Sequence, residues 1–436
     1  MTDEIPREGL RLVPLRDALR SGELPLEAHV AEILARIEVV EPRLRALLPE
    51  PERRTRLQHE VAALQERFPD PSARPPLFGV LVAVKDIISV DALPTRAGSA
   101  LPPASFAAPE ATVVVRLRAA GALILGKSVT TEFAYTDPGA TVNPCRPGHT
   151  PGGSSSGSAG AVAVGLAPLA LGSQTVGSVI RPAAFCGVVG FKPSYGRIPT
   201  DGVLYFSPSV DHVGLFTQDA EGMLVAAREL CDHWRDAPVS GLPVLGIPVG
   251  PYLDQARPDA LGAFARSVES LRAQGYDVRE VPALEDIDAI AKRHVRLMTV
   301  EFAREHEARF RAYGSLFRPM SAMLVDAARS LDATVAEEGR ASIGRVRHEL
   351  ESRMDAAGID AWICPAATGP APPGLAATGS PAMNLPWTHA HVPCLTLPSG
   401  RSEGLPLGLQ LIARRGADEA LLAWAVAAEA ALGLGV

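Results

Sequence analysis

A lysine at the end of an apolar run is the first residue of this 436-residue chain that could take part in catalysis. Lys85 follows residues 79–84, Gly-Val-Leu-Val-Ala-Val, which read as a buried strand. Burial lowers a lysine pKa towards the range in which the amine accepts a proton, so Lys85 is a candidate general base. Its side chain could equally extend to solvent or pair with Asp86.

Two serine-containing segments could supply a nucleophile and its surroundings. Residues 151–160 read Pro-Gly-Gly-Ser-Ser-Ser-Gly-Ser-Ala-Gly, and apolar sequence follows at once, which favours a structured loop over a flexible linker. In residues 172–182, Gly177 permits a sharp turn, and consecutive backbone N–H groups beside Ser178 could stabilise an oxyanion. A turn serine ahead of a helix that starts near Pro182 explains the second segment as well.

Taken together, these segments resemble the amidase-signature family. The resemblance is carried by Gly-Gly-Ser-Ser-Ser-Gly at 152–157, Gly-Ser at 177–178 and Pro-Ala-Ala-Phe-Cys-Gly-Val-Val-Gly-Phe-Lys-Pro at 182–193. The separation of Ser154 and Ser178 equals that in the family, and the similarity extends to residues 404–410. This resemblance implies an α/β fold in which α-helices sandwich a large mixed β-sheet.

The resemblance also implies roles for individual residues. Ser178 would be the nucleophile, Ser154 would follow a cis peptide bond and bridge by hydrogen bonds, and Lys85 would be the base. The expected oxyanion hole consists of the backbone N–H groups of Thr175, Val176, Gly177 and Ser178. Arg181, Gly153 and Tyr135 are the expected substrate contacts. No metal or organic cofactor is implied.

Residues 174–181 depart from the commonest family pattern. Many members have Asp-Thr-Gly-Gly-Ser-Ile-Arg where this chain has Gln-Thr-Val-Gly-Ser-Val-Ile-Arg, so Val176 replaces a glycine and Arg181 lies one position later. The version Ser-Val-Ile-Arg-Pro-Ala-Ala resembles the malonamidase-like branch, in which the corresponding arginine holds a substrate carboxylate. A structural arginine that joins neighbouring loops is the alternative for Arg181.

The expected reaction is hydrolysis of a small-molecule amide through an acyl-enzyme on Ser178. A carbamate or urea-type hydrolase, urethane- or biuret-like, is an alternative within the same family. A partner-dependent amidotransferase subunit is the second alternative.

Two other motifs suggest different proteins. Residues 121–128 match the letters of a P-loop, but Ala-Leu-Ile-Leu reads as a strand where a glycine-rich turn is needed, which argues against nucleotide binding. Residues 153–157 fit G-x-S-x-G with Ser155 as nucleophile and His389 or His391 as base. The turn-rich sequence before this motif disfavours a strand-to-helix elbow, and a structural role suits both histidines better.

Hydrophobic patterning predicts which elements position these residues. Helices are expected over 26–48, 52–68, 111–120, 159–166, 258–274 and 287–357 and from 418, and strands over 80–84, 122–125, 245–248, 276–281, 362–364, 392–397 and 407–411. This alternation predicts an α/β sheet. We expect one domain, 1–436, with a helical prelude (1–70), catalytic core motifs (77–215) and a segment that completes the sheet and the pocket loops (240–436).

Composition narrows the partners and the compartment. The chain is 47% hydrophobic and 21% charged, typical of a globular protein, and its net charge of −7 argues against nucleic acid. Glycine and serine in residues 150–180 argue against a membrane span. Five scattered cysteines disfavour disulfides and zinc, and the start lacks signal-peptide features, so a cytoplasmic location is expected. The expected partner is a small-molecule amide or carbamate, and assembly as a homodimer is left open.

Overall fold

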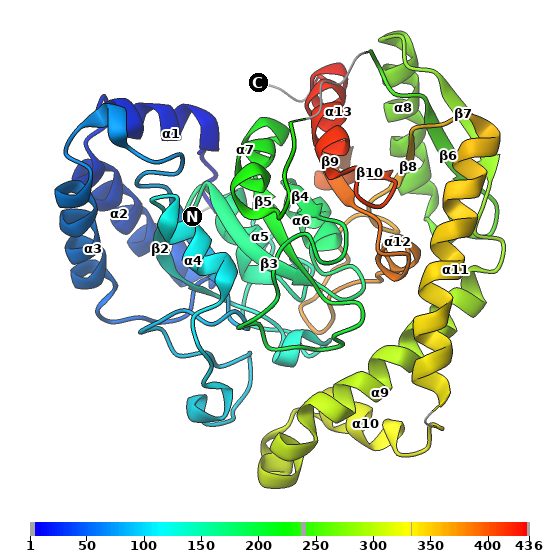
Figure 1. Ribbon diagram of the computed structural model, residues 1–436, viewed down its shortest axis with the longest axis horizontal. Helices are drawn as coiled ribbons and strands as arrows, with labels where there is room; N and C mark the ends of the chain where they lie inside the picture. Colours follow the sequence, from blue (N-terminus) through cyan, green and yellow to red (C-terminus); the bar gives the residue numbers. More distant parts are fainter. Residues whose placement is uncertain (1–4, 237–240, 333, 434–436) are drawn as a thin grey trace.

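The computed structural model describes residues 5–236, 241–332 and 334–433. Within these ranges, one ten-stranded sheet has the order β2-β1-β3-β5-β4-β9-β10-β8-β6-β7 (Figure 1). The strands are β1 (Leu81–Lys85), β2 (Leu123–Ser128), β3 (Leu169–Gln174), β4 (Val189–Lys192), β5 (His212–Thr217), β6 (Leu245–Val249), β7 (Val278–Pro282), β8 (Ala361–Pro365), β9 (Cys394–Ser402) and β10 (Leu405–Ala413).

Strand pairing makes the sheet mixed. β1 runs parallel to β2 and β3, and β6 runs parallel to β7 and β8. The strands between these two parallel groups pair antiparallel, from β3 with β5 through to β10 with β8. The prediction of a large mixed sheet is confirmed, and strands from the middle and C-terminal segments of the chain contribute to it.

Helices cover both faces of this sheet. They are α1 (Leu12–Ser21), α2 (Leu26–Leu44), α3 (Arg53–Arg67), α4 (Thr112–Ala119), α5 (Ser156–Ala163), α6 (Ile180–Cys186), α7 (Ala220–Leu230), α8 (Pro258–Ala273), α9 (Ile287–Tyr313), α10 (Pro319–Ala328), α11 (Thr334–Ala357), α12 (Leu385–His389) and α13 (Asp418–Ala431). Short 3₁₀ turns lie at Pro71–Ala73, Pro103–Phe106, Glu132–Ala134, Leu253–Gln255 and Gly314–Leu316.

Successive side chains of β1 point alternately into the two hydrophobic layers on either face of the sheet. Val82 and Val84 pack into the hydrophobic cluster that contains α4, α7, α8 and α13, whereas Leu81 and Ala83 pack into the cluster that contains α2 and α5. α6 also lies on the α5 side and contacts β4, β9 and β10. All four side chains are fully buried, as expected for a strand covered on both faces.

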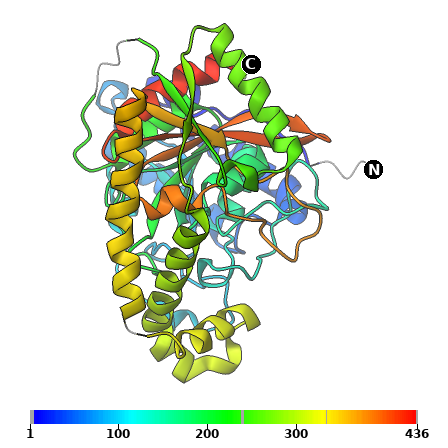
Figure 2. The ribbon, with the colours of Figure 1, turned by 90° about the vertical axis from the view of Figure 1, so that its right-hand side faces the viewer.

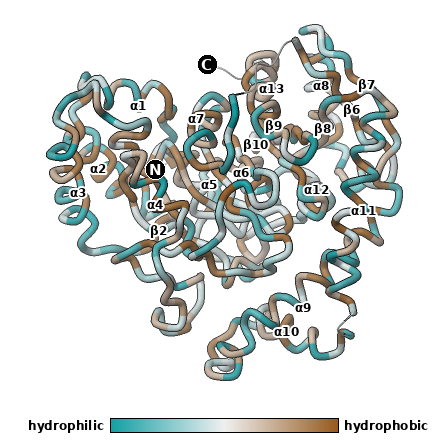
Figure 3. Tube along the Cα trace, viewed as in Figure 1, coloured by the Kyte–Doolittle hydropathy of each residue, from teal (hydrophilic) through white to brown (hydrophobic). Residues whose placement is uncertain are grey.

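The N-terminal helices lie at one end of the sheet, where α3 contacts β2 (Figure 1). Figure 3 shows hydrophilic residues recurring between hydrophobic ones along α3 and α9, the pattern of helices with one buried side. α2 ends at Leu44 rather than at the predicted residue 48, because Arg45 adopts a left-handed conformation with φ of 54°. No helix in the described ranges has the length and apolar character needed to cross a membrane.

The helical tract predicted over 287–357 is three helices rather than one. A turn at Gly314–Leu316 separates α9 from α10, and Pro319 occupies the first turn of α10, where its missing N–H costs nothing. α9 and α10 project from the sheet as an arm, and α11 runs back beside α9 (Figure 2). Continuous helical periodicity in the sequence conceals these breaks.

Other boundaries differ around the serine loops. α5 begins at Ser156 instead of 159, and α6 begins at Ile180 instead of near Pro182. β3, β4, β5, α7 and α12 were not predicted. β3 contains Gly172 and Ser173, which lack the β-branched and aromatic side chains that mark a strand in sequence. The serine-containing segments are therefore more regular than their composition indicates.

Candidate active site

Lys85 lies at the end of β1 with its side chain fully buried. Its Nζ donates to Ser154 Oγ at 2.6 Å and to Ser173 Oγ at 2.8 Å. The ion pair with Asp86 that was the alternative for Lys85 is formed by Lys127, whose Nζ lies 3.3 Å from Asp86 Oδ1. The amine of Lys85 therefore contacts hydroxyl groups.

The surroundings of Lys85 oppose its charged form. Burial lowers its pKa well below the ordinary value, because the ammonium would lose its hydration. The carboxyl of Asp211 acts in the opposite direction, and the guanidinium of Arg181 depresses the pKa further. A buried amine with a lowered pKa next to two hydroxyl groups can serve as a general base.

Ser154 follows a glycine pair in the loop before α5. The Gly153–Ser154 peptide bond is cis. A Cβ on Gly153 would lie 2.7 Å from Thr378 Cγ2, and one on Gly152 would lie 2.7 Å from Pro182 Cα. Neighbouring segments therefore pass too close for any side chain at either glycine, and this packing holds Ser154 over Lys85.

Ser178 lies in the loop between β3 and α6 and is 9% exposed. The backbone N–H groups of residues 175–178 donate to no acceptor within the described part of the chain. Since buried N–H groups are normally paired, these four are free to bind an oxyanion. Within the described residues Ser178 Oγ has no hydrogen bond to Ser154, the contact that would complete the relay; such contacts often form only with substrate bound.

A polar side chain on each side holds this loop in place. Gln174 Oε1 accepts hydrogen bonds from Val179 N at 2.8 Å and from Ile180 N at 3.0 Å. Gln174 Nε2 donates to Thr388 Oγ1 at 2.9 Å, and Thr388 Oγ1 donates to Val176 O at 2.7 Å. Thr388 on α12 therefore holds the carbonyl group of Val176, and the backbone N–H groups of the loop remain available to a ligand.

Asp211 supports the same loop from the start of β5. Its Oδ1 accepts from Thr175 Oγ1 at 2.6 Å, and its Oδ2 accepts from Phe206 N at 2.7 Å and Ser207 N at 2.9 Å. Burial raises the pKa of Asp211 to about 7, although these hydrogen bonds act to lower it. The carboxyl is therefore both a brace for the loop and the main charge that acts on Lys85.

Arg181 joins three segments near Ser154. Its Nε donates to Thr378 O at 2.8 Å, and its Nη2 donates to Gly153 O at 2.6 Å and to Thr378 Oγ1 at 3.2 Å. Nη1 is buried and has no protein partner among the described residues. Burial lowers the pKa of Arg181 to about 10, which still leaves the guanidinium charged at neutral pH. This geometry suits a structural role and leaves one donor for a ligand.

Tyr135 is half-buried on a loop adjoining Ser154. Its ring centroid lies 5.3 Å from that of Phe206 and 6.2 Å from that of Phe302. Thr131 links the two loops, because its Oγ1 donates to Tyr135 O at 2.9 Å and its N donates to Ser154 O at 3.3 Å. Tyr135 therefore lies near the serine loop, in an aromatic cluster.

Sequence reasoning missed several residues of this site, among them Ser173 and Asp211. Ser173 directly precedes Gln174 and contacts Lys85 because β3 pairs with β1, a pairing that the sequence did not predict. Asp211 carries no local signal, because it reaches Thr175 only through the pairing of β5 with β3.

The rival motifs adopt other structures. Residues 123–128 form β2, so the P-loop letters lie in a strand and form no phosphate-binding loop. Ser155 is fully buried, and its Oγ bonds to the main-chain N and O of Ser173. His391 contacts Ser209 O, and His389 contacts Ser342 and a second histidine, so neither serves Ser155.

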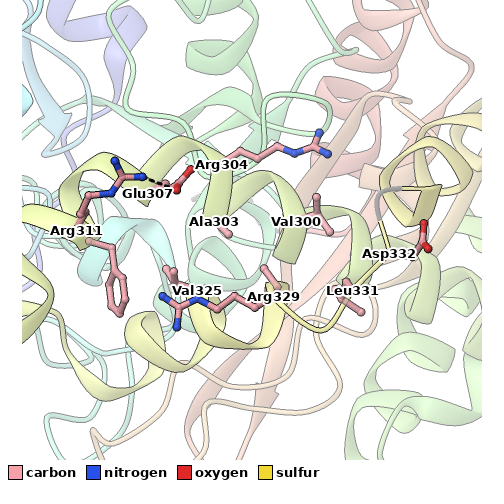
Figure 4. Close-up of a pocket in the computed structure, with 11 residues that line it drawn as sticks. Val300, Ala303, Arg304, Glu307, Arg311, Val325, Arg329, Leu331 and Asp332 are labelled. Atoms are coloured by element: carbon pink, nitrogen blue, oxygen red, sulfur yellow. Dashed lines mark hydrogen bonds and ion pairs between the residues drawn. The ribbon is translucent and has the colours of Figure 1, made fainter.

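A cavity of about 470 Å³ lies between α9 and α10, away from these residues (Figure 4). Val300 and Ala303 line it from α9 and Val325 from α10, and the ion pair of Arg311 with Glu307 lies at one end. None of the residues expected to act in catalysis lines it. It belongs to the projecting arm.

Comparison with known families gives one match that spans most of the chain. The family model described as Amidase matches residues 28–422. The chain belongs to the Amidase family. Members with this description act on carbon–nitrogen bonds, and this protein is an enzyme of that class.

Curated relatives cover nearly the whole of this amidase-family chain. The A subunit of glutamyl-tRNA(Gln) amidotransferase from Roseiflexus castenholzii is 32% identical over 471 residues, 96% of this chain and 94% of the relative. The subunit of the same name from Thermus thermophilus is 34% identical over 477 residues, 96% of each chain.

Solved structures agree with this family. A crystal structure described as an amidase superposes with a TM-score of 0.88 and 32% identity, covering 97% of this chain and 99% of that chain. A peptide amidase in complex with the competitive inhibitor chymostatin superposes with a TM-score of 0.84 and 26% identity, covering 96% and 97%. A chain from a protein complex described as revealing the origins of an s-triazine catabolic enzyme superposes with a TM-score of 0.86 and 27% identity, covering 97% and 99%.

Proposed function

We propose that this protein hydrolyses a small-molecule amide, with Ser178 as nucleophile, Ser154 as proton relay and Lys85 as base. The observation that carries this proposal is the 2.6 Å contact between Lys85 Nζ and Ser154 Oγ at the fully buried end of β1. A lowered pKa makes the neutral amine available there to accept the proton of Ser154.

The proposed reaction passes through an acyl-enzyme. Ser178 Oγ attacks the carbonyl carbon, its proton passes to Ser154 Oγ, and the Ser154 proton passes to Lys85 Nζ. The carbonyl oxygen becomes an oxyanion that the free N–H groups of residues 175–178 receive. As the C–N bond breaks, the proton returns through Ser154 to the leaving nitrogen. Water then cleaves the ester on Ser178 by the same proton path.

Arg181 is the proposed contact for an acidic substrate, as in the malonamidase-like motif. Its Nη1 is the buried donor that lacks a protein partner among the described residues, and a carboxylate would satisfy it. The contacts of Nε and Nη2 with residues 153 and 378 would then fix the orientation of the guanidinium. Gly153 and Tyr135 are proposed as further walls of the substrate site.

Partner-dependent amidotransfer is the second candidate function. The observation that favours it is the 31–34% identity to amidotransferase A subunits over nearly the full chain. In that case Ser178 would release ammonia from an amide donor for use by a partner. The machinery proposed for the acyl-enzyme would be the same.

One panel of substrates distinguishes the hydrolase from the partner-dependent amidotransferase. The purified chain alone would be assayed with small neutral amides, malonamate-like acidic amides, glutamine, carbamates, biuret-type ureas and aryl esters, each with Ser178→Ala as control. Turnover of an amide that Ser178→Ala abolishes supports the hydrolase, whereas full activity of Ser178→Ala contradicts the proposed nucleophile. Amide turnover seen only after a partner is added supports the amidotransferase.

The role of Arg181 is tested in the same panel with Arg181→Lys and Arg181→Met. Loss confined to acidic amides, with neutral amides retained, supports carboxylate binding. Equal loss on every substrate indicates that Arg181 only holds the loops around residues 153 and 378.

A further inference from the structure

Two buried histidines connect the loop of residues 175–178, the proposed oxyanion loop, to α9, α11 and α12. His294 on α9 places Nε2 3.1 Å from Thr175 O, and its Nδ1 lies 3.1 Å from His389 Nδ1 at the end of α12. His389 Nε2 in turn lies 2.8 Å from Ser342 Oγ on α11. Both rings are fully buried, so the chain of contacts is enclosed in protein.

When both rings are neutral, one set of donors and acceptors satisfies this series of contacts. Thr175 O only accepts, so His294 Nε2 carries the proton, and the Nδ1 of a neutral His294 accepts from His389 Nδ1–H. His389 Nε2 then accepts from the Ser342 hydroxyl. Arg293 Nε, which only donates, supplies Ser342 Oγ at 2.9 Å. All four contacts are satisfied by one set of tautomers, with Nε2–H on His294 and Nδ1–H on His389.

That set requires both rings to be neutral. Burial lowers the pKa of His294 to about 4. Burial, together with the positive charge of neighbouring groups, lowers the pKa of His389 to about 2. If His294 were protonated while His389 kept its Nδ1–H, two N–H groups would face one another at the 3.1 Å contact.

The series of hydrogen bonds ends at Thr175 O, which belongs to a peptide group of the expected oxyanion hole. Thr175 O and Val176 N belong to the same peptide, and Val176 N–H is one of the donors without a protein partner in the described part of the chain. A hydrogen bond to a peptide oxygen polarises the group and strengthens its N–H as a donor. Thr388 Oγ1 acts in the same way on Val176 O, the carbonyl of the next peptide.

Resting on the proposed function, we propose that His294 and His389 are positioning residues for the oxyanion hole. Through a one-way hydrogen-bond chain from Ser342, they fix an Nε2–H on His294 that orients and polarises the Thr175–Val176 peptide towards the developing oxyanion. Neither histidine touches substrate.

The first test compares His294→Met, which fills the space without a donor, with His294→Gln, whose amide nitrogen can replace Nε2–H. Removing a direct oxyanion donor costs about 10²–10³ in kcat, and an indirect contribution is smaller. We expect His294→Met to lower kcat by about tenfold to a hundredfold with KM within about threefold. His294→Gln should recover most of that loss.

A matched control exists on the same helix. His306 is also fully buried, and its Nε2 contacts Tyr205 O at 3.1 Å, a carbonyl outside residues 175–178. His306→Met should leave kcat within about threefold of wild type, so a comparable loss in both methionine variants would overturn the proposal. An unchanged kcat in His294→Met, or failure of His294→Gln to recover activity, would also overturn it.

Nitrogen-15 NMR of histidine-labelled full-length protein tests the tautomers without relying on activity. The His294 and His389 signals, assigned by their loss in His294→Gln and His389→Gln, should show protonated Nε2 on His294 and protonated Nδ1 on His389. The reverse tautomers would overturn the proposal even if the methionine variant does not fold. Activity in Ser178→Ala would instead overturn the proposed function, whereas an inactive Ser178→Ala beside a normal His294→Met would overturn only the histidine role.

Discussion

Replacing Lys85 by methionine would separate the proposed catalytic role of the buried amine from its effect on stability. The two side chains are similar in length, and the site is fully enclosed, so methionine can occupy the same space. Hydrolysis should fall by at least about 10²-fold, the lower range for loss of a general base. The more informative quantity is the free energy of unfolding as a function of pH.

The direction in which stability changes with pH follows from the lowered pKa of Lys85 in the folded protein. Between the folded and unfolded pKa values, the unfolded chain binds one more proton than the folded chain, so wild-type stability rises with pH. Each pH unit in this window contributes about 1.4 kcal/mol. Lys85→Met lacks this term, so its stability relative to wild type should increase by about 1.4 kcal/mol for each unit that pH falls below the unfolded lysine pKa of about 10.4.

A loss of stability that does not depend on pH opposes this gain in Lys85→Met. Ser154 and Ser173 each lose the Lys85 contact, and a buried hydroxyl without a partner costs about 1–3 kcal/mol. That loss is the same at every pH, so the slope identifies the lysine. The increase should stop at the folded pKa of Lys85, and the acid limb of wild-type kcat/KM should fall at the same pH.

The assay is equilibrium denaturant unfolding of wild type and variant between about pH 6 and pH 10, with the m-value checked for constancy. Lys127→Met is the comparison variant: burial lowers the pKa of Lys127 as well, but Asp86, 3.3 Å away, acts to raise it. Its loss should destabilise the protein at neutral pH, since the Asp86 carboxylate remains without a counter-ion.

A stability difference that is independent of pH would refute the reasoning for Lys85. It would mean that the amine stays charged in the folded protein across this range. A permanently charged ammonium cannot accept the Ser154 proton, so the base assignment would fail with it.

Three further substitutions test the surroundings of the base and the loop. Ser173→Ala removes one of the two hydroxyl partners of Lys85 and should lower kcat by roughly tenfold, the equivalent of one hydrogen bond of about 1.4 kcal/mol, in steady-state assays. Asp211→Asn removes the carboxylate that raises the pKa of Lys85, so the acid limb of the pH–rate profile should move to lower pH; a move to higher pH would contradict this electrostatic assignment. Gly177→Ala places a Cβ against Asn384 Oδ1, which should displace the loop and lower kcat by about 10²-fold or more without changing the thermal midpoint by more than a few degrees.

Local sequence predicted the elements that have a clear hydrophobic pattern. The runs at β1, β6 and β8 are continuous and apolar, which is what a strand covered on both faces requires. Sequence did not predict β3, because glycine and serine are depleted in most strands. β3 is stable as a strand because β1 and β5 pair with it on both sides, and that pairing is a property of the sheet.

The identity of the candidate catalytic residues came from the sequence alone. Lys85, Ser154 and Ser178 were singled out by residue type, glycine-rich surroundings and separation along the chain, all of which a single sequence records. The contacts that exclude a side chain at Gly153 and Gly177 come from Thr378 and Asn384, which only the fold brings there.

Tertiary structure alone decided what surrounds those residues. Asp211 directly precedes β5, His294 lies on α9 and Thr388 lies on α12. All three are distant in sequence from the Gly-Gly-Ser-Ser-Ser-Gly motif or follow the loop by many residues, yet each bonds to the loop of residues 175–178. Burial at the end of β1, which depends on the packed layers around it, sets the pKa of Lys85. Sequence determined which groups could react, and the packing of remote elements decided their protonation, their partners and the donors that remain free, because desolvation and hydrogen-bond geometry exist only once the chain has folded.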